Sequence, residues 1–325
     1  MSKIKSIGVF SSGGDAPGMN ACIRAVVRTA IHYKLVVYGI YRGFAGMTNG
    51  EILELDRRSV SGIIQQGGTI LKTSRSPEFM TREGRQKAYD NLKQHGISGI
   101  IAIGGDGTFH GLVDMMKESD FAVIGLPGTI DNDLYGTDFT IGYDTAVNTA
   151  IQAIDKIRDT AQSHDRLFLV EVMGRQAGFI AIESGISGGA EEILVPEVPT
   201  DLDAIAEHLK RRHVEGKMSL IMVIAEGDEA GDANTIAKKL KEMANISCRV
   251  TVLGHVQRGG SPTAKDRLLA SKLGYHAVKA LIEGKSGIMI GEIGNNITET
   301  PLEETFGKKK PIDFELIEMA RILSE

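Results

Sequence analysis

Two continuous apolar runs, residues 99–103 and 121–126, each lead directly into a glycine-rich turn that carries a carboxylate. The first turn reads Gly-Gly-Asp-Gly-Thr over residues 104–108, and the second reads Pro-Gly-Thr-Ile-Asp-Asn-Asp over residues 127–133. Apolar runs without polar alternation are typical of central strands in a parallel sheet, which helices cover on both faces. A strand that passes through a glycine turn into a helix is the repeating unit of a doubly wound α/β fold.

Strands and helices alternate along the rest of the chain in the same way. Apolar or β-branched runs predict further strands at residues 6–10, 35–41, 167–172, 219–225 and 249–253. Helical spacing predicts helices at residues 20–31, 60–64, 81–94, 145–161, 178–184, 202–214, 235–244, 262–282 and 313–322, with a loop at residues 43–50. With 325 residues the chain is long enough for two domains, and the alternation predicts a doubly wound α/β fold.

Charge and cysteine content bear on the partners and the location of the protein. The chain has 37 Lys and Arg against 42 Asp and Glu, so its formal net charge is −5 and we expect neither nucleic acid nor membrane partners. Cys22 and Cys248 form neither a metal-ligand spacing nor a disulfide framework. No apolar run reaches the roughly 20 residues of a membrane helix, and the N-terminal run is too short for a signal peptide. We therefore expect a soluble, cytoplasmic protein.

The glycine-rich turns indicate phosphate chemistry. Glycine has no Cβ, so backbone N–H groups in such turns can approach phosphate oxygens. Asp106, Asp131 and Asp133 could hold Mg²⁺ and accept a proton from an attacking hydroxyl. Residues 11–18 form a third turn of this kind, also directly after a strand. Ligands of open α/β sheets bind beyond the carboxyl ends of the strands, where these turns fall, so we predict a phosphoryl-transfer enzyme.

Each of these features also has a simpler structural interpretation. Glycine-rich turns between a strand and a helix are common, and carboxylates in an extended loop are usually solvated. The turn at residues 104–108 is neither a Walker A loop nor a Rossmann fingerprint. The Gly-Lys-Ser sequence at residues 284–286 lacks the upstream glycine of a Walker A loop, so we interpret it as a helix end.

Arginines at strand edges and in glycine-flanked turns indicate an anion site. A single arginine in a loop is usually a solvated surface group. Four arginines share these positions, however, and they are Arg166, Arg175, Arg249 and Arg258. Because guanidinium forks match the geometry of phosphate oxygens, the four together predict a clamp for a phosphate group.

In combination and order, the motifs of this chain resemble those of the bacterial ATP-dependent 6-phosphofructokinases. The matching motifs lie at residues 12–20, 104–108, 127–133, 172–175 and 252–262, so the resemblance covers nearly the whole chain. It implies ATP-dependent phosphorylation of fructose 6-phosphate at its 1-hydroxyl, the committing step of glycolysis, with Mg²⁺ as cofactor. It also implies two doubly wound α/β lobes with mainly parallel sheets. The ATP-binding lobe would comprise residues 1–141 plus 256–304, and the fructose-6-phosphate-binding lobe residues 142–255 plus 305–325.

The resemblance also assigns roles to individual residues. Asp131 matches the general base, with Thr129 beside it on the substrate, and Asp106 matches the Mg²⁺ ligand. Arg75 and Arg175 complete the catalytic set. The residues that match ATP contacts are Gly14, Arg75, Ser76, Gly105, Asp106, Gly107 and Thr108. The residues that match contacts to the sugar phosphate are Thr129, Ile130, Asp131, Arg166, Met173, Gly174, Arg175, Glu226, Arg249, His255, Val256, Gln257 and Arg258. In the family Arg166 and Arg249 reach the neighbouring subunit's site, which implies a homo-oligomer, typically a homotetramer.

Two glycines favour ATP over pyrophosphate as the phosphoryl donor. Pyrophosphate-dependent relatives have an aspartate and a lysine where this chain has Gly107 and Gly128, and glycine leaves room for the rest of a nucleotide.

The alternative functions are a pyrophosphate-dependent enzyme, a lipid or NAD kinase, and a catalytically inactive regulatory subunit. A lipid or NAD kinase does not explain the Thr-Ile-Asp-Asn-Asp loop. An inactive subunit is expected to have lost Asp106 or Asp131, and both are present.

A second anion site is conceivable near the N-terminus. Arg24 and Arg28 lie at positions i and i+4 of a predicted helix, and Arg57 and Arg58 follow in a loop, although a solvated helix face is the simpler interpretation. The resemblance matches an effector site for ADP or phosphoenolpyruvate at Arg24, Arg28, Arg57, Arg158, Gly189, Glu191 and Lys217. Relatives carry basic residues or histidine where this chain has Glu215, Met218 and Ser219. An acidic side chain there repels phosphate, so we expect weak or altered allosteric control.

Overall fold

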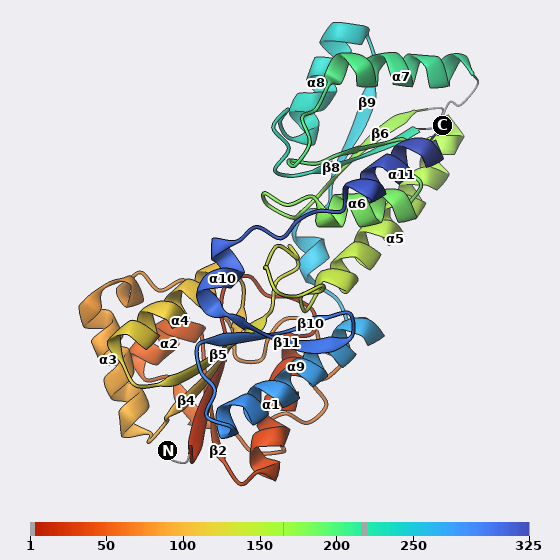
Figure 1. Ribbon diagram of the computed structural model, residues 1–325. Helices are drawn as coiled ribbons and strands as arrows, with labels where there is room; N and C mark the ends of the chain where they lie inside the picture. Colours follow the sequence, from red (N-terminus) through yellow and green to blue (C-terminus); the bar gives the residue numbers. More distant parts are fainter. Residues whose placement is uncertain (1–3, 165, 216–219, 325) are drawn as a thin grey trace. The chain divides into compact units, whose positions relative to one another are not determined.

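The computed structural model describes residues 4–164, 166–215 and 220–324 (Figure 1). The chain divides into two compact units. Unit 1 comprises Met1–Ile130, Leu134–Thr145 and Arg258–Lys310. Unit 2 comprises Asp131–Asp133, Ala146–Gln257 and Pro311–Glu325. The chain therefore passes between the units several times, and the short segment Asp131–Asp133 belongs to unit 2 although both its neighbours in sequence belong to unit 1.

Unit 1 is built on a seven-stranded sheet with the order β11-β10-β5-β4-β1-β2-β3. The five inner strands run parallel to one another, and the edge strands β3 and β11 pair antiparallel to their neighbours. The strands are β1 (Ser6–Ser11), β2 (Val36–Ile40), β3 (Ile52–Glu54), β4 (Gly99–Gly104), β5 (Ala122–Pro127), β10 (Ile288–Ile293) and β11 (Asn296–Pro301).

Helices cover both faces of this sheet, because its central strands are apolar on both faces. Every residue of β1 and β4 is buried. On one face α1 and α9 pack side by side, and on the other α2, α3 and α4 close a core that contains Phe10, Phe44 and Phe109 (Figure 1). The helices of unit 1 are α1 (Met19–His32), α2 (Gly43–Asn49), α3 (Arg82–Gln94), α4 (Asp106–Glu118), α9 (Ala264–Ile282), α10 (Leu302–Gly307) and the 3₁₀-helix η1 (Glu78–Met80).

Unit 2 is built on a four-stranded parallel sheet with the order β7-β8-β6-β9. Its strands are β6 (Leu167–Val172), β7 (Glu192–Leu194), β8 (Leu220–Ala225) and β9 (Cys248–Val252). One core joins α7 and α8 to the sheet, while α6 and α11 pack together with β7. The remaining elements are α5 (Tyr143–His164), α6 (Phe179–Ser187), α7 (Leu202–Val214), α8 (Ala233–Ala244), α11 (Phe314–Ser324) and the 3₁₀-helix η2 (Gly254–Arg258).

The predicted fold class is confirmed, since each unit is an α/β arrangement around a mainly parallel sheet. Two local predictions are wrong. Residues 60–64 form turns instead of a helix, and Gly62 there has a φ of 66°, which takes the backbone out of the helical region. The predicted loop at residues 43–50 instead contains α2 (Gly43–Asn49), because burial of Phe44 and Met47 outweighs the poor helix propensity of the glycines.

The sequence pattern also missed the hairpin of β10 and β11. Its two-residue turn, Gly294 and Asn295, has φ values of 54° and 65°, the backbone that a tight hairpin turn requires. A Gly-Asn pair between an apolar run and a segment with alternating threonines was the signal that could have revealed it. Among the described residues, no helix is both long and apolar enough to cross a membrane.

Candidate active site

Three glycine-rich turns meet at one edge of the unit 1 sheet. They follow β1, β4 and β5, which are neighbours in the sheet, so their carboxyl ends lie side by side. The backbone N–H of Ser12 donates to the carbonyl of Ile103 at 3.0 Å, and the N–H of Gly128 donates to the carbonyl of Gly104 at 2.9 Å. These bonds tie the turns together at the edge where ligands of such sheets bind.

The glycines of these turns serve different purposes. A Cβ atom on Gly104 would lie 2.3 Å from Oγ1 of Thr108 and 2.7 Å from the carbonyl oxygen of Ser12, so close packing requires glycine. A Cβ atom on Gly128 would lie 2.7 Å from Cγ2 of Ile103. A Cβ atom on Gly107 would meet no atom within 4 Å. Of the two glycines that favoured ATP, only Gly107 therefore borders open space, while Gly128 is required by packing.

The first turn of α4 fits an anion and a magnesium ion. The first N–H groups of a helix have no partner within it, and they and the positive end of the helix dipole attract phosphate oxygens. Asp106 is its first residue and has a half-exposed side chain, whereas Oγ1 of Thr108 is buried and has no hydrogen-bond partner. No group of three or more His, Cys, Asp or Glu gathers as a metal cage in the part of the chain that the structure describes. Magnesium needs no such cage, because one or two carboxylates suffice when phosphate and water supply the other ligands.

His110 contacts this carboxylate from the next turn of α4. Its Nε2 lies 3.1 Å from Oδ1 of Asp106. Its ring stacks on Phe306 of α10, with 3.7 Å between the ring centroids. Sequence reasoning did not select His110, although its position four residues after Asp106 on a predicted helix was a usable signal.

Arg258 lies against the turn after β1. A Cβ atom on Gly14 would come within 2.2 Å of Nη1 of Arg258, so the guanidinium packs directly on this glycine. Nε of Arg258 is buried without a hydrogen-bond partner. The resemblance grouped Arg258 with the sugar-phosphate residues, and within unit 1 the structure places it beside the predicted ATP residue Gly14.

The remaining predicted ATP residues of unit 1 are less closely assembled. Arg75 is exposed in the loop before η1, and its guanidinium bonds to no other described residue. Oγ of Ser76 accepts a hydrogen bond from the N–H of Phe79 at 3.3 Å, which shapes this loop. Gly105 lies next to Thr129, since a Cβ atom there would lie 3.5 Å from Cβ of Thr129. The structure therefore places Gly105 beside Thr129, while the Arg75 guanidinium has no bonded partner among the described residues.

Unit 2 assembles a second part of the predicted site. Asp131 is only 4% exposed, and its Oδ2 lies 3.5 Å from Nε of Arg175. The backbone N–H of Arg175 donates to Oε1 of Glu226 at 2.7 Å, and the N–H of Glu226 donates to the carbonyl of Val172. Arg175 follows β6 and Glu226 follows β8, the neighbouring strand. The sheet thus brings a buried carboxylate, an arginine and a second carboxylate together.

The backbone around Arg175 is constrained. Gly174 has a φ of 146°, and a Cβ atom there would lie 2.4 Å from the carbonyl oxygen of Ala177. Arg175 itself has a φ of 53°, an uncommon conformation for a residue with a side chain. The N–H of Met173 donates to Oε1 of Gln257 at 2.8 Å, and Gln257 is completely buried. Gln257 therefore ties η2 to the loop after β6, a contact that the sequence did not reveal.

Two predicted phosphate-binding arginines lie at the opposite end of the same sheet. Arg166 directly precedes β6, and Arg249 is the second residue of β9, paired with Phe168. The six residues of β6 span about 20 Å, so both exposed arginines are far from Arg175 within one chain. His255 and Val256 follow β9 and are exposed.

The predicted effector residues fall into two groups. Arg24 and Arg28 lie one turn apart on α1, and Arg57 is exposed in unit 1. Burial, followed by the charge of Arg28, lowers the pKa of Arg24 from its usual value. Lys217, Met218 and Ser219 lie outside the described residues.

The unit 2 members of the effector group already have partners. Nη2 of Arg158 donates to the carbonyl of Gly189 at 2.6 Å, and Oε2 of Glu191 accepts from the N–H of Ile221 at 2.6 Å. Oε2 of Glu215 accepts from Arg212 at 2.9 Å. The acidic residue that was expected to repel phosphate is thus partly neutralised by its neighbour.

Comparison with known proteins adds evidence that is independent of this geometry. The family model described as phosphofructokinase matches residues 6–281. ATP-dependent 6-phosphofructokinase 1 of Thermus thermophilus is 57% identical over 99% of this chain and 100% of its own length. The ATP-dependent 6-phosphofructokinase of Cytophaga hutchinsonii is 54% identical over 99% of this chain and 98% of its own length.

Solved structures agree with the family match. Phosphofructokinase from Saccharomyces cerevisiae superimposes with a TM-score of 0.86 at 38% identity, over 93% of this chain and 45% of the longer yeast chain. A pyrophosphate-dependent phosphofructokinase from Marinobacter aquaeolei shares the fold, with a TM-score of 0.84 at 23% identity over 96% of this chain and 86% of its own. The chain therefore belongs to the phosphofructokinase family.

Proposed function

We propose that this chain transfers a phosphoryl group from ATP to the 1-hydroxyl of fructose 6-phosphate, giving fructose 1,6-bisphosphate, the committing step of glycolysis. The observation that carries the proposal is the buried Asp131 held at 3.5 Å from Arg175, in a chain 57% identical to an ATP-dependent 6-phosphofructokinase. A buried carboxylate beside an arginine suits removal of a proton from an alcohol next to a phosphate.

Asp131 acts as the general base in this proposal. Its Oδ atoms accept the proton of the 1-hydroxyl as that oxygen attacks the γ-phosphorus, and Thr129 contacts the sugar beside it. Arg175 offsets negative charge on the transferred phosphoryl group, and Glu226 fixes Arg175 through its backbone N–H. Because phosphoryl transfer requires little covalent chemistry from the protein, positioning and charge carry most of the rate enhancement.

The glycine-rich turns of unit 1 hold the donor. The N–H groups of the first turn of α4 face the phosphates of ATP, and the open space at Gly107 accommodates the rest of the nucleotide. Asp106 would hold Mg²⁺, which neutralises phosphate charge when bound. The proposed ATP contacts are Gly14, Arg75, Ser76, Gly105, Asp106, Gly107 and Thr108, with Arg75 also reaching the transferred phosphate. The nucleotide would therefore occupy the ATP-binding lobe.

The acceptor contacts in this proposal come from the segment after β5, from residues that follow the unit 2 strands, and from Arg258. The proposed contacts are Thr129, Ile130, Asp131, Met173, Gly174, Arg175, Glu226, His255, Val256, Gln257 and Arg258. Arg166 and Arg249 lie at the other end of the sheet, so in this proposal they serve the site of a neighbouring subunit in a homotetramer. The effector ADP or phosphoenolpyruvate would bind at a separate site formed by Arg24, Arg28, Arg57, Arg158, Gly189, Glu191 and Lys217. In this proposal the enzyme acts in the cytoplasm.

A coupled assay with fructose 6-phosphate tests the activity and the donor together. We expect turnover with MgATP and turnover at least a hundredfold slower with magnesium pyrophosphate, about 2.7 kcal/mol in transition-state free energy. A faster rate with pyrophosphate would establish the pyrophosphate-dependent alternative. Absence of turnover with both donors would contradict the proposal.

Titration with phosphoenolpyruvate in the same assay tests the expected allosteric control. We expect weak inhibition, and strong sigmoidal inhibition would contradict the expectation of weak or altered control.

A further inference from the structure

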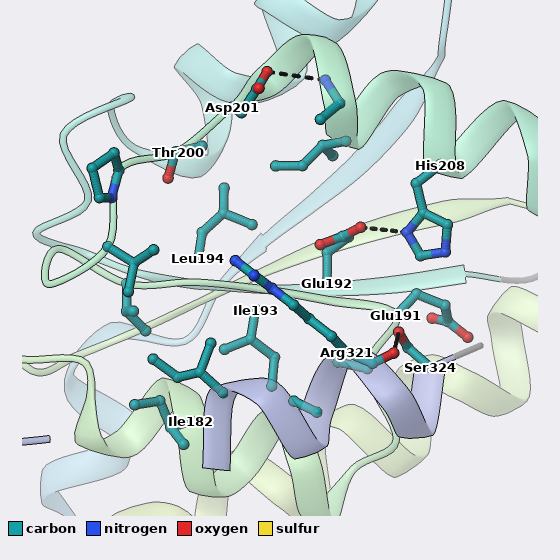
Figure 2. A pocket seen from close by; sticks show the side chains of 18 of the residues that line it. Ile182, Glu191, Glu192, Ile193, Leu194, Thr200, Asp201, His208, Arg321 and Ser324 are labelled. Carbon is teal, nitrogen blue, oxygen red and sulfur yellow. Dashed lines mark hydrogen bonds and ion pairs between the residues drawn. The ribbon is translucent and has the colours of Figure 1, made fainter. Parts of the chain in front are cut away.

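Unit 2 contains a cavity that the proposed reaction does not use. Its volume is about 380 Å³, and it lies under the C-terminal helix α11, with β7, α6 and α7 forming the other walls (Figure 2). None of the proposed ATP or sugar-phosphate residues lines it. Of the described residues in the proposed effector group, only Glu191 lines it. A cavity of this size is within the range of sites for small molecules.

The apolar walls of this cavity are aliphatic. They include Ile182 of α6, Ile193 and Leu194 of β7, Ile205 of α7 and Ile317 of α11. Among the residues that the structure describes, no phenylalanine, tyrosine or tryptophan lines the cavity. It therefore offers apolar contact to a flexible hydrocarbon body, and its one described aromatic ring, the imidazole of His208, is already paired with Glu192.

Two arginines supply unneutralised positive charge at the cavity. Arg321 extends from α11 into it (Figure 2), and Arg211 of α7 also lines it. Neither guanidinium makes a hydrogen bond or an ion pair with any residue in the described ranges. An unpaired guanidinium beside apolar walls is a strong donor to a carboxylate or phosphate oxygen.

The carboxylates of the cavity, in contrast, already have partners. Oε1 of Glu192 lies 2.5 Å from Nδ1 of His208 (Figure 2). Oδ1 of Asp201 accepts from the N–H of Ala204 at 3.0 Å. Oε2 of Glu191 accepts from the backbone of β8. The free hydrogen-bond donors left for a ligand are therefore the two guanidinium groups, while three carboxylates nearby disfavour a dianionic ligand such as a phosphate ester.

We propose that this cavity binds a small aliphatic monocarboxylate, with its carboxylate on Arg211 and Arg321 and its hydrocarbon body against the isoleucines. Burial of the hydrocarbon contributes affinity, and the two guanidinium groups select ligands that carry a carboxylate. The proposal does not depend on the proposed catalytic activity, since no catalytic residue takes part.

Isothermal titration calorimetry of the full chain with octanoate tests the site. We expect one octanoate per chain, with 1-octanol and octyl phosphate each binding at least tenfold more weakly. Arg211→Gln and Arg321→Gln should each weaken octanoate binding about tenfold, because each removes a charge-assisted hydrogen bond. Lys210→Gln is the matched control, since this exposed residue neighbours Arg211 on α7 but does not line the cavity, and it should change the affinity less than twofold.

A variant that fills the cavity separates binding inside it from binding to the outer surface. Ala320→Phe places a ring in the space under α11 and should abolish octanoate binding while circular dichroism remains unchanged. If that variant does not fold, the double variant Arg211→Gln with Arg321→Gln carries the test. The proposal is overturned if octanoate does not bind the wild-type chain, if the double variant binds it equally well, or if 1-octanol or octyl phosphate binds as tightly as octanoate.

Discussion

Nε2 of His110 lies 3.1 Å from Oδ1 of Asp106, and the His110 ring is held in place by stacking on Phe306. Partners of this kind orient a carboxylate toward a metal, and their loss commonly lowers metal affinity by about 10- to 100-fold. We expect His110→Ala to weaken binding of Mg²⁺ with a nucleotide about tenfold, measured by calorimetry in the absence of sugar phosphate.

A second variant distinguishes orientation from simple loss of the ring. Phe306→Leu leaves His110 in the chain but removes its stacking partner, so it should cause a smaller loss of Mg²⁺ affinity in the same direction. His32→Gln is the control, because that exposed histidine ends α1 and is remote in sequence from α4. An unchanged Mg²⁺ affinity in His110→Ala would show that this contact is incidental.

Removal of the proposed base should affect kcat far more than binding. We expect Asp131→Ser to lower kcat by about 10²–10⁴-fold, the usual contribution of a general base, with a much smaller change in KM for fructose 6-phosphate. Steady-state assays measure both constants. Asp120→Asn, an exposed aspartate in the loop before β5, is the control. Turnover near the wild-type rate in Asp131→Ser would refute the assignment.

Arg258 and Arg249 are expected to affect KM instead. Arg258→Ala should mainly raise KM for fructose 6-phosphate, because it removes a proposed phosphate contact, and an unchanged KM would remove Arg258 from the clamp. If Arg249 serves a neighbouring subunit, mixing inactive Asp131→Ser chains with Arg249→Ala chains should restore turnover at low fructose 6-phosphate concentration, since some sites in the hybrid combine two intact halves. Hybrid oligomers confirmed by native mass spectrometry that turn over no faster than Arg249→Ala alone at that concentration would rule out shared sites.

The central part of the fold could be predicted because it depends on local sequence. Apolar or β-branched runs predicted β1, β2, β4 and β5 of the unit 1 sheet, though not β10, and Thr81 marked the start of α3, where its Oγ1 accepts from the N–H of Gly84 at 3.1 Å. The helix α2 could not be predicted, because its glycines oppose helix formation and only packing of Phe44 in the core overrides them. Local patterns contain no record of such long-range contacts.

The candidate site was predicted in a similarly uneven way. The turns that bear Asp106 and Asp131 were evident as strand ends, but the roles of individual residues came from the resemblance to a family. The contact of Arg258 with Gly14 and the tie between Gln257 and Met173 join segments distant in sequence, so no spacing rule points to them. The first contact lies within unit 1 and the second within unit 2.

The glycines of the β4 turn give a matched pair of stability predictions. Gly104→Ala should destabilise the protein by about 1–3 kcal/mol, because the new methyl group would overlap Thr108 and a backbone oxygen. Gly107→Ala should raise the free energy of unfolding by up to about 1 kcal/mol, because its added methyl group meets open space and restricts the unfolded chain. Urea unfolding of both variants measures these changes. Equal stability of the two would contradict the predicted difference in packing.

Asp266 should make stability depend on pH. This buried residue of α9 accepts hydrogen bonds from the N–H groups of Gly142 and Thr145 at 2.8 Å each, which fixes the start of α5. Burial raises the pKa of its carboxyl above the usual value, although these hydrogen bonds partly oppose the shift. Between the two pKa values the native state binds more protons than the unfolded state, so the contribution of Asp266 to stability falls as the pH rises through that interval.

The variant Asp266→Asn isolates this dependence, because it removes the titrating group. The free energy of unfolding of the wild type minus that of the variant should decrease as the pH rises from about 4 toward the raised pKa and then level off. Urea unfolding at closely spaced pH values measures the difference, in which other titrating groups largely cancel. A constant offset caused by the loss of hydrogen bonds does not affect the slope. A difference that is flat, or that increases with pH, would show that burial does not raise the pKa of Asp266 in the folded protein.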